Sequence, residues 1–354
     1  MIYRIRRRFL LGVVLVMVAG WLLGGSAQVV SPPSFQSKWG EPGAGPGQFN
    51  APEGIALGTQ GQVYLLDTEN SRVQLFDPQG DFLSEWGSLC SVSATEPCLG
   101  RFKEPEGIAT GLDGTVYVAD SGNDRIELFD AQGGFIAQWG SSGSADGQLS
   151  NPVGLALDRQ GNLYVADTLN QRIEVFDSSG AFLRAWGSKG SSEGQFKFPS
   201  GVAVNPDSGL VYVTDNVNNR VEQFDLQGNF LSSWGSLCAL VGDKERPAGT
   251  GCKSPQGEGQ FKLPFGIALD KAGNVYVVDQ GNRRIEAFDA RGRFLFQWGS
   301  PCELSSGAGC VDPDGSGPLE PGDGQFLSPK GIAIAPDGTI YIADSDNNRV
   351  EVFK

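Results

Sequence analysis

Residues 52–87 read PEGIALGTQG QVYLLDTENS RVQLFDPQGD FLSEWG, and the rest of the chain repeats this unit. The unit opens with Pro-x-Gly, continues through an apolar run that ends at Asp67, places Asn70 and Arg72 in the order Asp-x-x-Asn-x-Arg, and closes with Phe-Asp and Trp-Gly. Its glycine, Gly54, recurs at intervals of 53, 47, 47, 65 and 65 residues, at Gly107, Gly154, Gly201, Gly266 and Gly331. A repeat of about 40 to 50 residues that contains several short strands is typical of a β-propeller.

Each unit predicts four strands, named a to d in chain order. Val, Ile, Tyr and Phe, which favour strands, fill residues 54–57, 63–67, 72–77 and 82–86 of the first unit. The intervening residues 59–62 and 77–80 have the composition of hairpin turns. Because an isolated sheet of this kind leaves an open edge and an apolar face, the six sheets must stack in a ring. The predicted fold class is all-β, a six-bladed β-propeller of four-stranded antiparallel blades.

The two ends of the chain indicate how the ring closes. The sixth unit stops at Phe353-Lys354 without a strand d, and an additional strand with Trp-Gly, residues 35–40, precedes the first unit. We expect this N-terminal strand to pair with the C-terminal one, because the pairing removes the last open edge.

The units resemble NHL repeats, which makes the chain similar to bacterial exported or membrane-anchored NHL-repeat proteins. The resemblance rests on Pro-x-Gly-Ile-Ala, Val-Tyr-Val-Ala-Asp-Ser-Gly-Asn-x-Arg-Ile and Phe-Asp-x-x-Gly, and it covers residues 34–354. It implies a six-bladed propeller and, most often, a scaffold for protein or RNA contacts. It does not imply a single function.

The N-terminal segment has the pattern of an export signal. Four arginines within residues 1–8 precede an apolar run over residues 9–25, followed by Gly25-Ser26-Ala27. The pattern predicts a signal peptide cleaved after Ala27, with an uncleaved membrane anchor and a twin-arginine signal as alternatives. We therefore expect a signal peptide or anchor at 1–28, a linker at 29–34 and the propeller at 35–354. The propeller is then extracytoplasmic, whether secreted, periplasmic or anchored at the outer side of the cytoplasmic membrane.

Six cysteines form three local pairs, each of which follows a Trp-Gly-Ser stretch. Their spacing does not suit a zinc site, and disulfides persist outside the reducing cytosol. We expect the disulfides Cys90–Cys98, Cys238–Cys252 and Cys302–Cys310.

Composition limits the function. The chain has no histidine, which removes the commonest general base and zinc ligand. Without its first eight residues the chain has 23 Lys and Arg against 41 Asp and Glu, a formal charge of −18. Such a surface repels phosphate backbones and anionic headgroups, so nucleic acid is not expected as a partner. Contact with the membrane is expected only through the N-terminal segment.

The Asp-x-x-Asn-x-Arg sets occur in all six units, which favours a structural role. We expect the aspartate to accept backbone N–H groups of the b–c turn and the arginine to pair with nearby carboxylates.

The variable positions are more informative about function. The residue inside Pro-x-Gly is expected at the channel mouth, where it is in turn Glu53, Glu106, Val153, Ser200, Phe265 and Lys330. The b–c turns add Glu69, Asp124, Asn219, Arg283 and Asp346.

The three cysteine-bearing insertions are all d–a loops, which share one face with the b–c turns. Loops on a rigid scaffold commonly carry binding, so this face is the predicted binding surface. The alternatives are ordinary solvated side chains at the mouth and disulfides that only protect long loops.

One insertion also matches a calcium loop in the spacing of its oxygen donors, with glycine at position 6. The candidate ligands are Asp312, Asp314, Ser316, Glu320 and Asp323. A plain acidic loop is the alternative, because flanking helices are absent and no cofactor is required by the rest of the sequence.

The sequence favours a binding or scaffold protein that recognises a protein, peptide or glycan through the d–a/b–c face. The alternative is a divalent-metal-dependent hydrolase or lyase with carboxylate ligands in the channel, and a third interpretation is a purely structural spacer.

Overall fold

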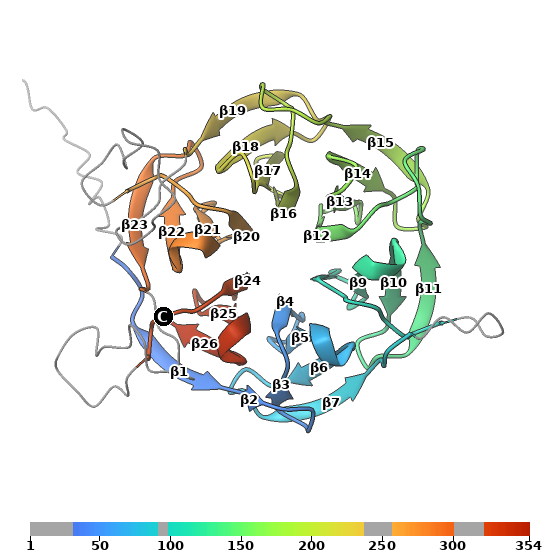
Figure 1. Ribbon diagram of the computed structural model, residues 1–354, viewed down its shortest axis with the longest axis vertical. Helices are drawn as coiled ribbons and strands as arrows, with labels where there is room; N and C mark the ends of the chain where they lie inside the picture. Colours follow the sequence, from blue (N-terminus) through green and yellow to red (C-terminus); the bar gives the residue numbers. More distant parts are fainter. Residues whose placement is uncertain (1–30, 91–97, 237–256, 301–321) are drawn as a thin grey trace, which may run out of the picture. The chain divides into compact units, whose positions relative to one another are not determined.

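Six four-stranded antiparallel sheets surround a central axis (Figure 1) in a computed structural model that describes residues 31–90, 98–236, 257–300 and 322–354. In every blade strand a lies innermost and strand d outermost. The predicted fold class is confirmed.

The first three blades consist of β4 (Pro52–Leu57), β5 (Val63–Asp67), β6 (Arg72–Phe76) and β7 (Phe82–Trp86); β8 (Gly107–Thr110), β9 (Val116–Asp120), β10 (Arg125–Phe129) and β11 (Phe135–Trp139); and β12 (Pro152–Leu157), β13 (Leu163–Asp167), β14 (Arg172–Phe176) and β15 (Phe182–Trp186).

The other three consist of β16 (Pro199–Asn205), β17 (Leu210–Asp215), β18 (Arg220–Asp225) and β19 (Phe230–Trp234); β20 (Pro264–Leu269), β21 (Val275–Asp279), β22 (Arg284–Phe288) and β23 (Phe294–Trp298); and β24 (Pro329–Ile334), β25 (Ile340–Asp344), β26 (Arg349–Phe353) and β1 (Phe35–Trp39). Two short strands, β2 (Glu41–Pro42) and β3 (Gln48–Phe49), pair in parallel. Four b–c turns contain a single turn of 3₁₀-helix: η1 (Thr68–Asn70), η2 (Ser121–Asn123), η3 (Gln280–Asn282) and η4 (Ser345–Asn347).

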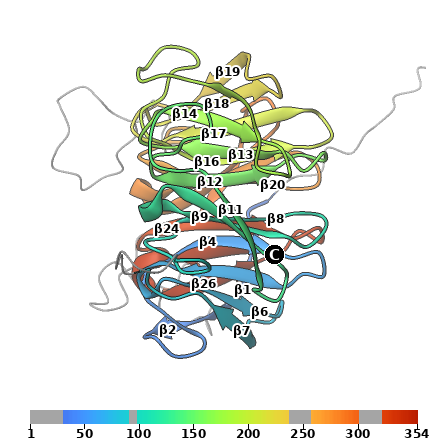
Figure 2. The ribbon, with the colours of Figure 1, turned by 90° about the vertical axis from the view of Figure 1, so that its right-hand side faces the viewer.

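The ring closes as the sequence predicts. β1 pairs antiparallel with β26, with Trp39 opposite Val350 and Ser37 opposite Val352. Backbone hydrogen bonds of 2.9 Å in both directions join Ser34 and Lys354 beyond the last paired residues. As a result β4 and β24, from the two ends of the repeat array, lie side by side (Figures 1 and 2).

The core is divided among the interfaces between neighbouring blades. A tryptophan that ends one strand d packs on the next blade: Trp39 lies 4.4 Å from the ring of Phe76, centroid to centroid. The same indole covers Gly80 in the adjacent c–d turn, where a Cβ atom would lie 2.5 Å from the ring. This packing explains why Trp-Gly and Phe-Asp-x-x-Gly recur together, because the tryptophan and phenylalanine of these motifs pack neighbouring blades against each other.

The Asp-x-x-Asn-x-Arg sets attach each d–a loop to its blade. In the third blade Asp167 Oδ2 accepts hydrogen bonds from Asn170 and from Arg172 Nε, and the guanidinium also donates to the carbonyl of Gln148. The expected arginine–carboxylate pairing is confirmed. The backbone N–H that Asp167 Oδ1 accepts comes from Ser150 in the d–a loop, and not from the b–c turn as expected, because the loop folds back over the end of strand b.

Residues 1–30, which hold the predicted export signal, lie outside the described residues. In the part of the chain that is described, no helix is long and apolar enough to cross a membrane.

Candidate functional site

The innermost strands approach the axis so closely that the third residue of Pro-x-Gly must lack a side chain. A Cβ atom on Gly107 would lie 1.7 Å from the carbonyl oxygen of Val153, and one on Gly331 would lie 2.1 Å from that of Glu53. The other four glycines face the neighbouring blade's carbonyl in the same way, with hypothetical contacts of 2.2 to 2.7 Å, at Gly54, Gly154, Gly201 and Gly266.

This close packing leaves a small cavity of about 120 Å³ on the axis. The structure brings all six predicted Pro-x-Gly side chains to its wall: Glu53, Glu106, Val153, Ser200, Phe265 and Lys330. The residue that follows each Pro-x-Gly glycine is apolar, and these six residues form a ring in the cavity wall: Ile55, Ile108, Leu155, Val202, Ile267 and Ile332. The cavity therefore combines a polarised rim with an apolar wall.

Two groups hold the cation of this rim. Lys330 Nζ forms a salt bridge with Glu53 Oε1, and it lies 5.6 Å from the centroid of the Phe265 ring. The Glu53 side chain is only 8% exposed, and its second oxygen, Oε2, has no hydrogen-bond partner among the described residues. The rim thus contains a buried carboxylate that is satisfied on one side only.

Burial controls the protonation of both glutamates. It raises the pKa of Glu53, while the charge of Lys330 and its hydrogen bond act in the opposite direction. Burial and the neighbouring Glu53 raise the pKa of Glu106 to about 7, against smaller lowering effects of Lys330 and Asn151. Glu106 has no ion-pair partner in the described part of the chain.

The predicted b–c residues fall into two structural classes. Asp124 and Asn219 adopt a left-handed conformation directly before the arginine of the repeat. Their side chains accept the backbone N–H groups of Asn151 (2.8 Å) and Leu263 (2.9 Å). Arg283 occupies the same position, where a guanidinium cannot accept a hydrogen bond. These contacts give Asp124 and Asn219 a role in fixing the next blade's d–a loop.

Glu69 and Asp346 stand two residues earlier in the turn and are exposed. Ser200, by contrast, is buried, and its hydroxyl lies 3.0 Å from Thr214 Oγ1. Glu69 and Asp346 are therefore open to a ligand, whereas the Ser200 hydroxyl is already engaged.

A group of exposed apolar side chains on this face is missed by the sequence reasoning. We call it the apolar sector: it is 40% to 52% exposed and consists of Leu169, Phe198, Val217 and Leu263, from the third, fourth and fifth blades. Phe198 and Leu263 have φ angles of 56° and 51°, although bulky residues rarely adopt the left-handed region. The signal was present in the sequence, because Leu169 and Val217 occupy the turn position that holds Glu69 and Asp346 in other blades.

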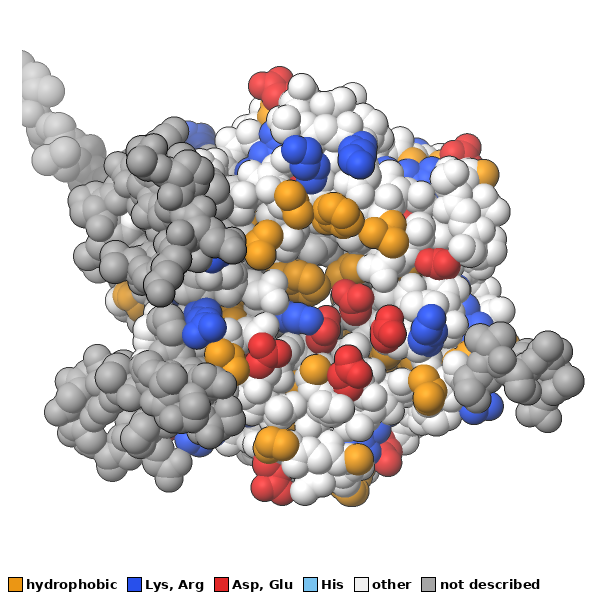
Figure 3. All heavy atoms as spheres, in the orientation of Figure 1, with side chains coloured by type: hydrophobic (Ala, Val, Ile, Leu, Met, Phe, Trp, Pro, Cys, Tyr) orange, Lys and Arg blue, Asp and Glu red, His pale blue; other side chains and the backbone are white. Residues whose placement is uncertain are grey.

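The opposite half of the face is acidic. We call this the acidic sector: Glu53, Glu69, Glu104, Glu106 and Asp346, from the first, second and sixth blades. The charges of Glu69 and Asp346 act on Glu53, and that of Glu104 acts on Glu106, so the five carboxylates share one electrostatic environment. Figure 3 shows acidic side chains gathered beside the axis next to an arc of hydrophobic ones.

The loops that mark this face are only partly described. Cys90 and Cys98 form a disulfide with a Cα–Cα distance of 5.6 Å, as predicted. Cys238, Cys252, Cys302 and Cys310 lie outside the described residues, as do Asp312, Asp314, Ser316 and Glu320 of the candidate calcium loop. Asp323 is described and forms a salt bridge of 2.6 Å with Lys38. The described residues contain no group of three or more side chains suited to hold a metal ion.

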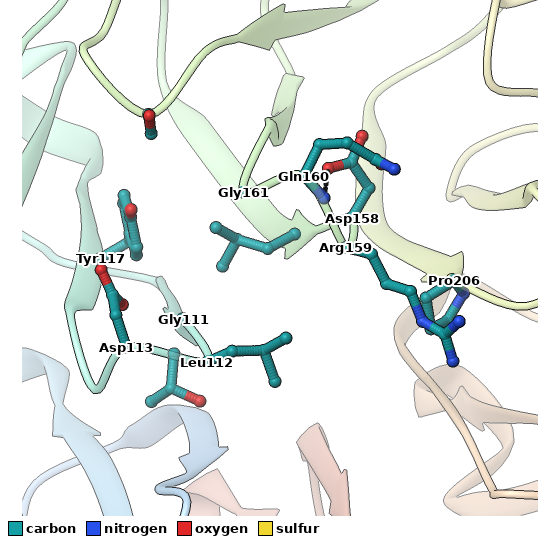
Figure 4. Close-up of a pocket in the computed structure, with 12 residues that line it drawn as sticks. Gly111, Leu112, Asp113, Tyr117, Asp158, Arg159, Gln160, Gly161 and Pro206 are labelled. Carbon is teal, nitrogen blue, oxygen red and sulfur yellow. Dashed lines mark hydrogen bonds between the residues drawn. The ribbon is translucent and has the colours of Figure 1, made fainter.

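A larger hollow of about 630 Å³ lies on the other face, among the a–b turns of the second to fourth blades. Asp113, Tyr117, Arg159 and Pro206 border it, and Leu112 extends into it (Figure 4). Its carboxylates are used by the turns themselves, since Asp113 Oδ1 accepts the N–H of Thr115. The hollow was not predicted from the sequence, because short turns carry no insertion that would mark it.

Comparison with known proteins identifies the repeat. The model of the NHL repeat matches residues 49–76, 149–176, 196–224 and 326–353, which lie in the first, third, fourth and sixth blades. Each match ends within or at the end of strand c of its blade.

The chain is 27% identical over 110 residues to Protein brain tumor of Drosophila melanogaster, which covers 30% of this chain and 10% of that protein. It is 38% identical over 80 residues to B-box type zinc finger protein ncl-1 of Caenorhabditis elegans, covering 18% and 9%. NHL repeat-containing protein 3 of Mus musculus is 28% identical over 127 residues, covering 35% and 34%. The matched part spans only about a tenth of the first two relatives.

Solved structures share the fold at low identity. Virginiamycin B lyase from Staphylococcus aureus superposes with a TM-score of 0.55 at 14% identity, covering 91% of this chain and 99% of that one. A protein of unknown function from Bacteroides thetaiotaomicron superposes with a TM-score of 0.61 at 18% identity, covering 91% and 75%. At this identity the likeness shows the six-bladed fold alone.

Proposed function

The chain belongs to the NHL-repeat family, and from this premise we propose that it is an exported binding protein that recognises a protein, peptide or glycan through its d–a/b–c face. The observation that carries the proposal is the division of this face into an apolar and an acidic sector around the channel mouth. Exposed apolar patches beside polar groups are characteristic of interaction sites.

The apolar sector supports binding because the backbone of two of its residues, Phe198 and Leu263, is held in place. The N–H of Phe198 donates to Gln171 Oε1 at 2.8 Å, and that of Leu263 donates to Asn219 Oδ1 at 2.9 Å. Each bond joins a b–c turn to the d–a loop of the next blade. A loop whose backbone is fixed in this way loses little conformational entropy when a partner covers it.

The charge of the chain indicates the kind of partner. A formal charge of −14 overall, with acidic side chains gathered at the mouth, attracts a partner that carries positive charge. The apolar sector adds a preference for aliphatic or aromatic side chains. A peptide segment meets both requirements better than a glycan does.

The alternative, a metal-dependent hydrolase or lyase, draws support from the fold shared with virginiamycin B lyase. A catalytically inactive variant of that lyase carries alanine in place of a histidine, and this chain contains no histidine. Among the described residues that line the axial cavity, only Glu53 and Glu106 are carboxylates, and Glu53 is paired with Lys330. Elemental analysis of the purified chain tests this alternative, which requires a stoichiometric divalent ion.

Photo-crosslinking from two exposed leucines tests the proposed face. A photoreactive residue at Leu169 lies in the apolar sector, and one at Leu112, which is 84% exposed, lies on the opposite face as the matched control. In the native host we expect a discrete adduct at Leu169 in at least about tenfold excess over Leu112. Equal yields at the two positions, or an adduct at Leu112 alone, would show that the proposed face is not the binding surface.

A further inference from the structure

We infer that the channel mouth receives the ammonium group of a lysine side chain from the partner, with its methylene stem and neighbouring apolar residues against the apolar sector. The inference rests on the proposed function and names the chemistry of the segment that this face recognises. It is carried by the geometry of the rim, by one unsatisfied buried oxygen and by the arrangement of the two sectors.

The unsatisfied oxygen is Glu53 Oε2. The Glu53 side chain is more than nine-tenths buried, it lines the cavity, and Lys330 satisfies only its other oxygen. A buried polar atom without a partner is unfavourable unless a ligand or water completes its hydrogen bonding. A hydrogen-bond donor that enters the cavity would remove this defect.

The rim also carries more acidic than basic side chains. Glu53 and Glu106 share one cation, Lys330, and that cation is already held by Glu53 Oε1 and by the ring of Phe265. Three further carboxylates of the acidic sector, Glu69, Glu104 and Asp346, add to the negative potential. One lysine does not neutralise these carboxylates, so the rim attracts a second cation.

The size of the cavity selects a single side chain. About 120 Å³ admits the end of one side chain, and the ring of Ile, Leu and Val residues behind the rim offers no polar side-chain atom to a group that goes deeper. An ammonium group would stop at the level of Glu53 and Glu106, because only there do carboxylates replace its water shell. Its three donors can reach acceptors on two separate blades.

The two sectors fix the context of this lysine. The mouth lies between the acidic sector, on the sixth, first and second blades, and the apolar sector, on the third to fifth. A peptide whose lysine enters the mouth can place residues on one side of that lysine against Leu169 and Val217. We therefore expect the recognised segment to carry leucine-like residues next to the lysine.

Two fluorescein-labelled peptides test the inference with the full chain. The first presents Leu-Leu-Lys-Leu-Leu between Gly-Ser ends, and the second has acetyl-lysine in place of the lysine. Acetylation removes the charge and keeps the stem, so we expect at least about tenfold weaker binding in fluorescence anisotropy. Equal affinities of the two peptides, or no binding of either, would overturn the inference. Free n-butylamine serves as the small-molecule arm: an amine that binds more tightly than the lysine peptide would also overturn it.

A variant pair locates the effect. Glu106→Gln keeps the shape of the side chain and breaks no ion pair, so we expect the preference for lysine over acetyl-lysine to fall about tenfold. The matched control, Glu193→Gln, removes an equivalent charge from an exposed d–a loop and should leave the preference unchanged. An unchanged preference in Glu106→Gln would count against the inference. If Leu169 still gives its adduct, the binding face stands and only the ammonium site falls.

Discussion

At the scale of single residues, the chain depends on glycines that stand where two blades touch. The Pro-x-Gly glycines let neighbouring innermost strands approach, and the c–d glycines let a tryptophan lie flat on the next blade. Neither property follows from turn chemistry alone. Both follow from the contact that a Cβ atom would make, and they explain why these glycines recur in unit after unit.

Gly107→Ala is therefore expected to destabilise the propeller by about 2 kcal/mol or more, since its Cβ atom would lie 1.7 Å from the Val153 carbonyl oxygen. The control is Gly45→Ala, where the nearest atom is the end of the Gln48 side chain at 3.0 Å, which can move. Denaturant unfolding of both variants gives the comparison. Similar free energies of unfolding for the two variants would show that the innermost strands are not packed as described.

The residue scale also shows where sequence reasoning stops. Repetition identified the structural sets, and variation between units identified the six rim residues. The sequence pattern could not separate Asp124 and Asn219 from Glu69 and Asp346, because the two pairs differ in the direction of their side chains. The first pair binds the adjacent loop, and the second pair is exposed. The apolar sector was missed because the exposure of Phe198 and Leu263 depends on a left-handed backbone conformation, which their residue types do not predict.

At the scale of the strand, five of the six c strands bury a glutamate two residues after the arginine of the repeat. The five fully buried glutamates are Glu127, Glu174, Glu222, Glu286 and Glu351. The first blade has Gln74 at this position. Each arginine thus faces two carboxylates, as Arg125 faces Asp120 and Glu127. One guanidinium compensates both charges only in part.

Burial raises the pKa of Glu127 to about 8, with Asp120 adding to the effect and Arg125 opposing it. Burial likewise raises the pKa of Glu174 and of Glu222 to about 7. The folded chain holds these protons more tightly than the unfolded chain, whose glutamates titrate near 4.5. The contribution of these glutamates to stability is therefore complete below that pH and is lost as the pH rises through 7 to 8.

The free energy of unfolding should fall by up to about 1.4 kcal/mol per pH unit for each proton that the folded state holds in excess. Denaturant titrations at pH 5.5 and 8.5 measure the difference. Glu127→Gln, which copies the natural Gln74, should reduce the slope. A propeller that is more stable at pH 8.5 than at pH 5.5 would contradict the burial of these glutamates.

At the scale of the whole molecule, the fold was predictable because one unit is repeated and because its missing strand is found at the other end of the chain. The functional face was only partly predictable. The loops and rim residues pointed to it, but its division into two sectors appears only when six blades are placed around one axis. The large hollow among the a–b turns has no counterpart in the sequence pattern.

The closed ring underlies every statement about the mouth and its sectors, since these residues meet only if the sixth blade is complete. Hydrogen–deuterium exchange along β26 tests closure directly. With β1 and β25 on its two sides, β26 should exchange as slowly as β22, which is an inner strand of the fifth blade. Fast exchange over Arg349–Phe353 while β22 stays protected would mean that β26 is an open edge, and the ring as described would be wrong.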